Sequence, residues 1–153
     1  MQFLNDLLNN RPLLISASAW LIAGILKCIV ECIVYKKFNL LRIVGTGGMP
    51  SSHTATVVSL AISIGYYCGL NSSEFALAMI FMIIVIHDAV GVRLETGKQA
   101  KVLNTMMFES QAFKDLDFEK KLKEYVGHTP SQALVGAIVG LAVSIFMIVV
   151  VFR

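Results

Sequence analysis

Two histidines stand at the starts of apolar runs, and they are the side chains best suited to chemistry in this sequence. His53 lies in the stretch GTGGMPSSHT, and His128 opens the stretch HTPSQALVGAIVG. One imidazole can attack a phosphorus atom while another protonates the leaving oxygen, so a histidine pair suits phosphoryl transfer. Each histidine alone is more often an interfacial residue without a catalytic role. The pairing of the two stretches is therefore what favours catalysis.

The first stretch has the composition of a helix start that can bind an anion. Gly48 permits a close approach of the backbone to a ligand. Pro50 suits the first turn of a helix, where its missing N–H costs nothing. Ser51 and Ser52 add donors, and the free N–H groups of a helix start lie at the positive end of its dipole. The stretch is either a capped helix start without a ligand or a phosphate cradle.

The second stretch predicts another helix start. We expect Thr129 at the N-cap and Pro130 at the first helical position, and Gln132 falls where a capping box places Glu or Gln. Gly136 and Gly140 then share one helix face, a spacing typical of close helix packing in membranes. Two helix starts, two histidines and several cations at one end of a bundle favour the phosphate cradle.

Charged side chains interrupt or end the apolar runs, where ionisable groups are costly and often functional. Lys27 and Glu31 are four positions apart, so they are either functional or a pair that neutralises itself. Asp88 lies near the end of the third run, and Arg93 directly follows that run. Asp88 is expected either to form an ion pair with Arg93 or Lys98, or to orient the imidazole of a histidine.

The whole chain has the composition of a membrane protein. Of its 153 residues, 56% are hydrophobic and 15% are charged, against about 25% charged in average soluble proteins. The apolar runs lie at about residues 13–35, 52–70, 75–92 and 130–152, each near the roughly 20 residues of a spanning helix. We expect an all-α integral membrane bundle of about four transmembrane helices, forming a single domain over residues 1–153. The modest net charge of +3 indicates no nucleic-acid partner.

The connections between these runs predict the orientation of the chain. Residues 71–74 form a short turn, whereas residues 93–129 form a long charged loop. Within that loop, the apolar spacing of residues 118–126 predicts a cytoplasmic amphipathic helix. Ten cations fall on the side of the two long loops and two on the side of the termini. The positive-inside rule therefore places both histidines at the cytoplasmic face of the cell membrane and both termini outside. The ten are Lys36, Lys37, Arg42, Arg93, Lys98, Lys101, Lys114, Lys120, Lys121 and Lys123, and the two are Arg11 and Arg153.

Three motifs together resemble a known superfamily. MPSSH is similar to the Pro-Ser-Gly-His motif of the type 2 phosphatidic acid phosphatases, which share a site with the vanadium haloperoxidases. HTPSQALVGAIVG resembles that superfamily's third motif. GTGGMPSSHTA, DAVGVRLETGKQAKVLN and GHTPSQ jointly resemble its divergent bacterial and plant branch, the acid phosphatase/vanadium-dependent haloperoxidase-related proteins. The resemblance covers about residues 20–140.

The resemblance implies a phosphoric ester hydrolase that uses neither a metal nor another cofactor. His128 would be the nucleophile that forms a phosphohistidine, and His53 would be the general acid. The phosphate would be bound by residues that carry donors or positive charge, namely Lys27, Arg42, Gly48, Ser51, Ser52 and Arg93.

The sequence also departs from the superfamily pattern. The parent first motif, a lysine followed after six residues by Arg-Pro, has no match. Leu122 stands where the third motif has an arginine, and Gln132 stands where it has an aspartate. A carboxylate orients the imidazole and stabilises its cationic form, whereas glutamine orients without supplying charge.

Two functions are therefore expected. The first is a membrane phosphatase that hydrolyses a lipid phosphate monoester or pyrophosphate, such as phosphatidylglycerophosphate, at the cytoplasmic face. The second is a non-catalytic phosphate-lipid-binding or transport-related membrane protein that retains the anion cradle, which the altered third motif favours. Both would contact membrane lipids. Trapping a phosphohistidine at His128 distinguishes the two.

Overall fold

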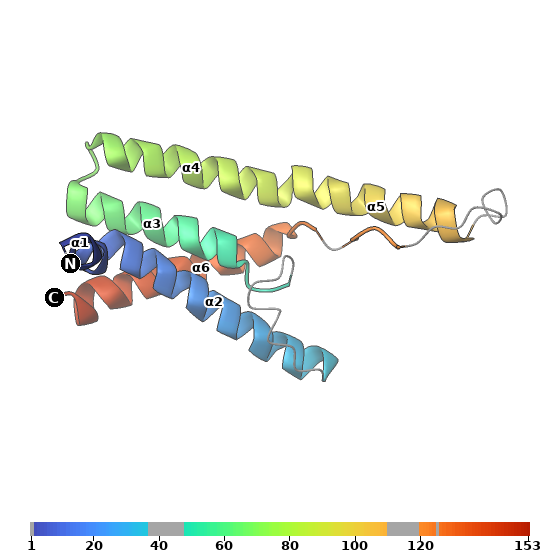
Figure 1. Cartoon of the computed structure of the whole chain (residues 1–153), viewed down its shortest axis with the longest axis horizontal. Helices are drawn as coiled ribbons and strands as arrows, with labels where there is room; N and C mark the ends of the chain where they lie inside the picture. Colours follow the sequence, from blue (N-terminus) through green and yellow to red (C-terminus); the bar gives the residue numbers. More distant parts are fainter. Residues whose placement is uncertain (1, 37–47, 110–119, 125) are drawn as a thin grey trace.

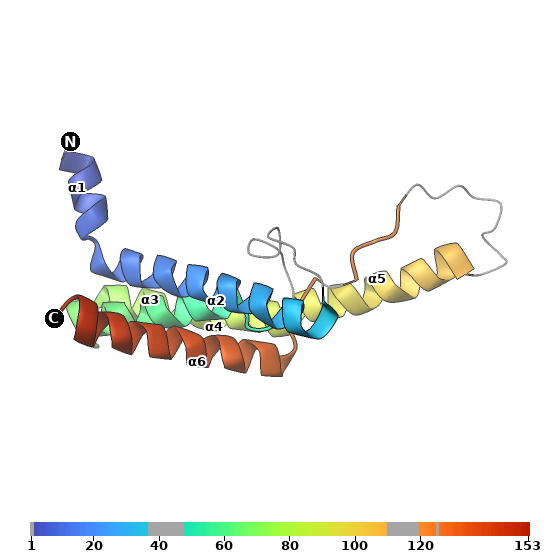
Figure 2. The same cartoon turned by 90° about the horizontal axis from the view of Figure 1, so that it is seen from below.

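The computed structural model describes residues 2–36, 48–109, 120–124 and 126–153, and every regular element within these ranges is a helix. The predicted all-α class is therefore confirmed. In chain order the elements are α1 (Gln2–Asn9), α2 (Arg11–Tyr35), α3 (Ser52–Cys68), α4 (Ser73–Val90), α5 (Val92–Glu109), α6 (Pro130–Phe146) and a π-helical turn (Met147–Val151). Helices α2, α3, α4 and α6 form a bundle, and α1 turns away from its axis (Figures 1 and 2).

Within the part of the chain that the structure describes, three helical segments are long and apolar enough to cross a membrane, by length and composition, namely Arg11–Val34, Ser73–Phe108 and Pro130–Val151. They expose large apolar side chains such as Ile84 and Leu134, as helices facing lipid do. Helix α3 has 17 residues and is about 25 Å long, slightly shorter than the ~30 Å hydrocarbon core of a bilayer. Its crossing of the membrane, and with it the count of four spans, stays a prediction.

Helix α3 is the centre of the bundle, since it packs against α2, α4 and α6. Its buried residues are small or β-branched, which lets neighbouring helices approach closely: Ser52, Thr54, Ala55, Val57, Ser59, Ala61, Ser63 and Gly65. A Cβ atom on Gly136 or Gly140 of α6 would lie 2.5 Å from the carbonyl oxygen of Ser51 or Ala55, respectively. The predicted close packing at these two glycines is therefore confirmed.

The ends of the bundle are held by contacts between helices distant in sequence. The Arg11 guanidinium at the start of α2 lies 5.5 Å from the ring centroid of Tyr67 and 5.7 Å from that of Phe152. This cation–π contact fixes the start of α2, the end of α3 and the C-terminus at one level. Both termini accordingly lie at the same end of the bundle (Figure 1).

The two helix starts that carry the histidine motifs differ in one detail from the prediction. Ser51 is the N-cap of α3, and its Oγ accepts a hydrogen bond from the Thr54 N–H at 3.3 Å. Pro50 precedes this cap, so the prediction that it occupies the first turn is wrong, because Ser51 takes the capping position. The capping box at the start of α6 is confirmed: Thr129 and Gln132 each accept a hydrogen bond from the other's backbone N–H.

Helices α4 and α5 follow each other through Gly91 and form a rod that extends beyond the bundle (Figure 1). Residues 120–124 and 126–129, which return toward α6, are not helical. The predicted amphipathic helix is therefore wrong for these residues, whereas Phe118, Glu119 and Tyr125 lie outside the described residues. The physical reason is Asn104, whose side chain bonds both the N–H and the carbonyl of Leu122 and so replaces the hydrogen bonds of a helix.

Candidate functional site

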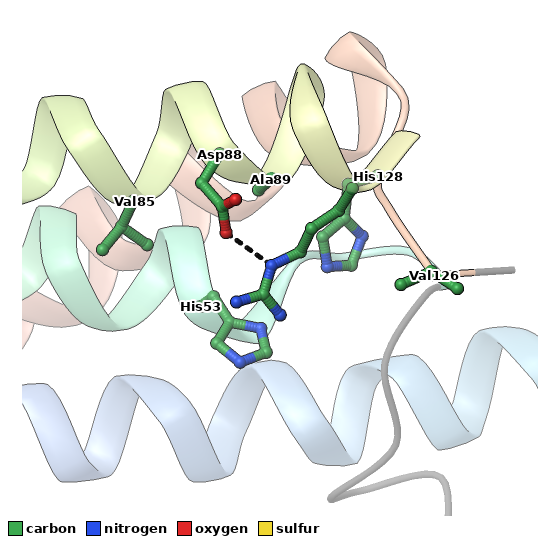
Figure 3. A pocket seen from close by; sticks show the side chains of 7 residues that line it. His53, Val85, Asp88, Ala89, Val126 and His128 are labelled. Atoms are coloured by element: carbon green, nitrogen blue, oxygen red, sulfur yellow. Dashed lines mark hydrogen bonds and ion pairs between the residues drawn. The ribbon is translucent and has the colours of Figure 1, made fainter. Parts of the chain in front are cut away.

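A pocket of about 120 Å³ lies where α3, α4, α5 and the segment before α6 meet. One water needs roughly 10–15 Å³ by this measure, so the pocket has room for a group much larger than a water. Its lining combines titratable and apolar side chains (Figure 3): His53, Val85, Asp88, Ala89, Arg93, Val126 and His128. Four of the predicted site residues, His53, Asp88, Arg93 and His128, are thus brought together.

His53 enters the pocket because it is the second residue of α3. The residue before it, Ser52, is buried, and its hydroxyl accepts a hydrogen bond from the Lys27 Nζ at 3.4 Å. Lys27 itself is 1% exposed, so its ammonium is held inside the bundle beside the helix start. The positive charge of Lys27 therefore lies beside the N-terminus of α3, which is the end of the helix that favours a bound anion.

His128 is placed by its backbone. Its N–H donates to the carbonyl of Ala89 in α4 at 3.0 Å, and its residue is 3% exposed. The imidazole faces His53, with ring centroids 6.3 Å apart and an angle of 56° between the ring planes. The Nδ1 atom of His128 is buried without a hydrogen-bond partner within the described part of the chain. A buried polar atom of this kind is costly and suggests that the site is completed by a ligand or water.

The pKa of the His128 imidazole is held below its usual value of 6.5, chiefly because burial disfavours the charged form. The side chain of Gln132 acts in the opposite direction and favours the protonated form. The charges of Lys27 and His53 lower the pKa further, and the Gly48 backbone raises it. The net result is an imidazole that is neutral at physiological pH, which is the form that can act as a nucleophile.

Arg93 reaches the pocket from the first turn of α5 and is bound there by Asp88 of α4. The Arg93 Nε donates to the Asp88 Oδ2 at 2.5 Å (Figure 3, dashed line). The expected ion pair between Asp88 and Arg93 is therefore present. Lys98, the other cation considered, bonds Glu95 instead at 2.7 Å. The pair spans the junction of the two helices and leaves the terminal guanidinium nitrogens of Arg93 available to an anion.

Gln132 takes part in the cap of α6 and also acts on His128, whose protonated form its side chain favours. Its Oε1 accepts from the Thr129 N–H at 3.1 Å, and its backbone carbonyl accepts from the Ser51 N–H at 3.2 Å. The second contact joins the start of α6 to the cap of α3. Gln132 therefore binds the two motifs together, and it supplies no negative charge at the position where the superfamily has an aspartate.

The other predicted phosphate-binding residues lie outside the pocket lining. Gly48 has φ +88° and approaches α2 so closely that a Cβ would lie 3.1 Å from the Glu31 Oε1 and 3.3 Å from the Lys27 side chain. The Ser51 hydroxyl accepts from the Thr54 N–H and hydroxyl and is fully buried, so its oxygen serves the helix cap. Arg42 lies outside the described residues. Among the described residues, no group of three or more His, Cys, Asp and Glu side chains is arranged to hold a metal ion.

Sequence reasoning missed the apolar side of the pocket. Val85 and Ala89 lie on the same face of α4 as Asp88, at the spacing of a helix surface, and Val126 approaches from the segment before α6. The i, i+3, i+4 spacing of Val85, Asp88 and Ala89 is the signal that could have identified two of them. Leu122, which replaces the superfamily arginine, does not line the pocket.

Comparison with known proteins shows the family of the chain. The model of the Divergent PAP2 family matches residues 8–143. The uncharacterized membrane protein YuiD of Bacillus subtilis (strain 168) is 37% identical over 152 residues, covering 93% of this chain and 96% of YuiD. No solved structure matches the chain. The two histidine motifs, helix α3 and most of α6 fall within the matched region, and the chain belongs to the Divergent PAP2 family of membrane proteins.

Proposed function

We propose that the protein is a membrane phosphatase that cleaves a lipid phosphate monoester or pyrophosphate through a phosphohistidine. The observation that carries this proposal is the His53–His128 pair, whose ring centroids are 6.3 Å apart across one pocket. A phosphoryl group between the rings would be in reach of both imidazoles. The Arg93 guanidinium in the same pocket supplies the charge that a bound phosphate needs.

In the first step, a nitrogen of neutral His128 attacks phosphorus. The nitrogen–phosphorus bond forms as the bond from phosphorus to the ester oxygen breaks. His53, as its imidazolium, gives its proton to the leaving oxygen, so that the lipid departs as an alcohol or, from a pyrophosphate, as a monophosphate. Arg93, Lys27 and the N-terminus of α3 stabilise the charge on the remaining oxygens.

In the second step, water replaces the lipid. His53 is now neutral and takes a proton from the water as its oxygen attacks phosphorus. The nitrogen–phosphorus bond breaks, inorganic phosphate leaves, and His128 returns to its neutral form. The two steps balance with one water consumed and no metal or redox partner.

The surroundings of the pocket favour a lipid as the substrate. Its apolar lining residues Val85 and Ala89 belong to α4, whose neighbouring residues Ile83 and Ile84 are exposed on the helix surface. A headgroup in the pocket would therefore leave its acyl or isoprenyl chains along the apolar surface of α4. With the loops in the cytoplasm, a lipid made on the inner leaflet, such as phosphatidylglycerophosphate, fits this placement.

One observation favours a second candidate, a protein that binds phosphate lipids without cleaving them. The Nδ1 of His128 has no hydrogen-bond partner among the described residues, and Gln132 supplies an uncharged amide where the superfamily has an aspartate. A nucleophilic histidine normally has its second nitrogen held by a carboxylate or amide. A binding protein of this kind would use the same anion site and would not cleave the bound lipid.

The decisive experiment measures phosphate release and covalent labelling together. Purified protein in detergent is given ³²P-labelled phosphatidic acid, phosphatidylglycerophosphate and an isoprenyl pyrophosphate. We expect release from at least one lipid, loss of both release and label in His128→Asn, and a kcat lowered about 10²–10⁴-fold in His53→Asn. The matched control is His87→Asn, because His87 is exposed and does not line the pocket.

The two candidates give different results in this assay. Acid-labile, base-stable label on His128 with phosphate release supports the phosphatase. Retention of lipid without release and without label overturns the phosphatase in favour of the binding protein.

A further inference from the structure

One part of the motif DAVGVRLETGKQAKVLN plays no role in the pocket. Its last residue, Asn104, lies on α5, which extends beyond the bundle (Figure 1), yet Asn104 is only 3% exposed. Residues 120–124 and 126–127, here called the strap, cover it. The strap leads directly into His128. The burial of the polar Asn104 side chain on a helix that protrudes from the bundle is explained by its hydrogen bonds to the strap.

Asn104 uses its whole amide group on the strap. Its Nδ2 donates to the Leu122 carbonyl at 2.9 Å and to the Glu124 Oε1 at 2.8 Å, and its Oδ1 accepts from the Leu122 N–H at 2.8 Å. Asparagine provides this combination of donor and acceptor on one short side chain, whereas aspartate lacks the donors. The contact is thus specific for the amide, and it fixes the strap at the level of Leu122.

Nearer to the pocket, two glycines without side chains allow the strap to lie directly against α5. A Cβ on Gly97 of α5 would collide with the Glu124 carbonyl, and a Cβ on Gly127 would collide with the backbone of Leu94. The backbone of the strap is therefore in direct contact with the backbone of α5 at these two glycines. Ala100, which lies on α5 between Gly97 and Asn104, is also buried. Gly97, Ala100 and Asn104 form one face of α5, which we call the dock.

The contacts of the strap leave it little slack. It meets α5 at Asn104 through Leu122 and at Leu94 through Gly127. These two positions of α5 are about 15 Å apart along the helix axis, and five chain steps reach at most ~17 Å. The next residue, His128, donates its N–H to the Ala89 carbonyl at 3.0 Å. His128 thus follows directly on a segment that Asn104 binds.

We propose that Asn104 is a positioning residue for His128, acting through the strap from roughly 20 Å away along the rod. The expected effect on kcat rests on the proposed function, whereas the expected effect on the burial of His128 does not. Release of the strap from the dock would leave the binding groups Lys27, Ser52 and Arg93 in place and move the imidazole. Loss of Asn104 should therefore lower kcat with little change in KM.

The test uses variants of the dock in the full-length protein. Asn104→Ala removes all three hydrogen bonds, and Asn104→Asp sets a carboxylate against the Glu124 carboxylate and the Leu122 carbonyl. Adding Glu124→Gln to Asn104→Asp restores one donor–acceptor pair. Gly97→Ala displaces the strap in a second way that leaves Asn104 intact. Thr105→Ala is the matched control, because Thr105 is exposed on the next position of α5.

The first readout is independent of activity. Modification of His128 by diethyl pyrocarbonate, measured peptide by peptide with mass spectrometry, should be slow in the wild type because His128 is 3% exposed. We expect about tenfold faster modification in Asn104→Ala, Asn104→Asp and Gly97→Ala, since several buried hydrogen bonds or close contacts are lost. The exposed His53 and His87 serve as internal standards for an intact fold. The double variant should recover part of the protection.

The second readout is kcat and KM for the lipid substrate. A lowered kcat at constant KM with partial recovery in the double variant supports the positioning role, and wild-type protection of His128 in Asn104→Ala overturns it. An inactive wild type in which Asn104→Ala still exposes His128 overturns the proposed function and leaves the positioning role standing.

Discussion

The imidazoles of His53 and His128 face each other across one pocket, with ring centroids 6.3 Å apart. The two residues come from helix starts far apart in sequence, and these starts are directly joined. The Ser51 N–H, at the cap of α3, donates to the Gln132 carbonyl in the first turn of α6 at 3.2 Å. The histidine pair is therefore held by a rigid connection between two capped helices.

Arg93 should contribute to phosphate affinity rather than to the chemical step. Its guanidinium lines the pocket, and Asp88 fixes it through the Nε. A charge-assisted hydrogen bond contributes about 1.5–3 kcal/mol, and the lower end applies because the Arg93 side chain is 47% exposed. We expect Arg93→Ala to raise the inhibition constant of inorganic phosphate about tenfold, measured by competition with the lipid substrate.

The control for Arg93 is Lys98→Ala. Lys98 is also a cation of α5, but it bonds Glu95 and does not line the pocket. Its removal should leave the phosphate inhibition constant unchanged. Equal weakening by both variants would mean that only the general positive charge of α5 matters, and it would contradict a specific role for Arg93.

Gly136 should be required for the approach of α6 to the cap of α3. A methyl group there would lie 2.5 Å from the Ser51 carbonyl oxygen, which belongs to backbone and yields little. Overpacking of this kind typically costs about 1–3 kcal/mol. Gly136→Ala should lower the thermal unfolding midpoint in detergent, followed by circular dichroism, whereas Ile138→Ala on the exposed face of α6 should not. An unchanged midpoint in Gly136→Ala would show that the helices are not packed this closely.

The features that the sequence predicted well depend on local chemistry. The capping box at Thr129 and Gln132 and the small-residue face of Gly136 and Gly140 follow from short spacings, and both are confirmed. The convergence of His53 and His128 required only that the starts of α3 and α6 lie at the same end of the bundle. Membership in the family follows from the motifs themselves.

The features that the sequence did not predict depend on contacts between distant segments. The apolar spacing of residues 118–126 favours a helix, but Asn104 bonds the backbone N–H and carbonyl of Leu122, and residues 120–124 are not helical. No local signal at Leu122 reports a partner on α5. In the same way, no local signal reports that the Gln132 backbone carbonyl accepts a hydrogen bond from the Ser51 N–H at the cap of α3.

The pKa of His128 should determine how far activity persists under acidic conditions. Burial, followed by the charges of Lys27 and His53, holds this pKa below 6.5, so the imidazole stays neutral when the pH falls through 6.5. The acidic limb that His128 contributes to kcat/KM should therefore have its midpoint below 6.5, because attack requires the neutral form. The other ionisable groups facing the pocket, Asp88 and Arg93, form an ion pair with each other.

Lys27→Met tests this assignment, since it removes one of the positive charges that lower the pKa of His128. The NMR titration of His128 should move to higher pH in this variant and remain below the ordinary value, because burial persists. Lys98→Met, which alters a cation outside the pocket, should leave the titration unchanged. A titration of His128 at or above 6.5 in the wild type would contradict the buried, neutral nucleophile.

The orientation of the chain gives the last prediction. The Arg11 contact with Tyr67 and Phe152 sets the start of α2, the end of α3 and the C-terminus at one end of the bundle, opposite the histidines. The ten cations of the loop side should keep the histidine end in the cytoplasm. A reporter active only outside the cell should therefore be active when fused after Arg153 and when inserted in the turn before α4, at Asn71. It should be inactive when inserted at Lys120. Activity at Arg153 without activity at Asn71 would mean that α4 and α6 do not both cross the membrane, and activity at Lys120 with inactivity at Arg153 and Asn71 would contradict this orientation.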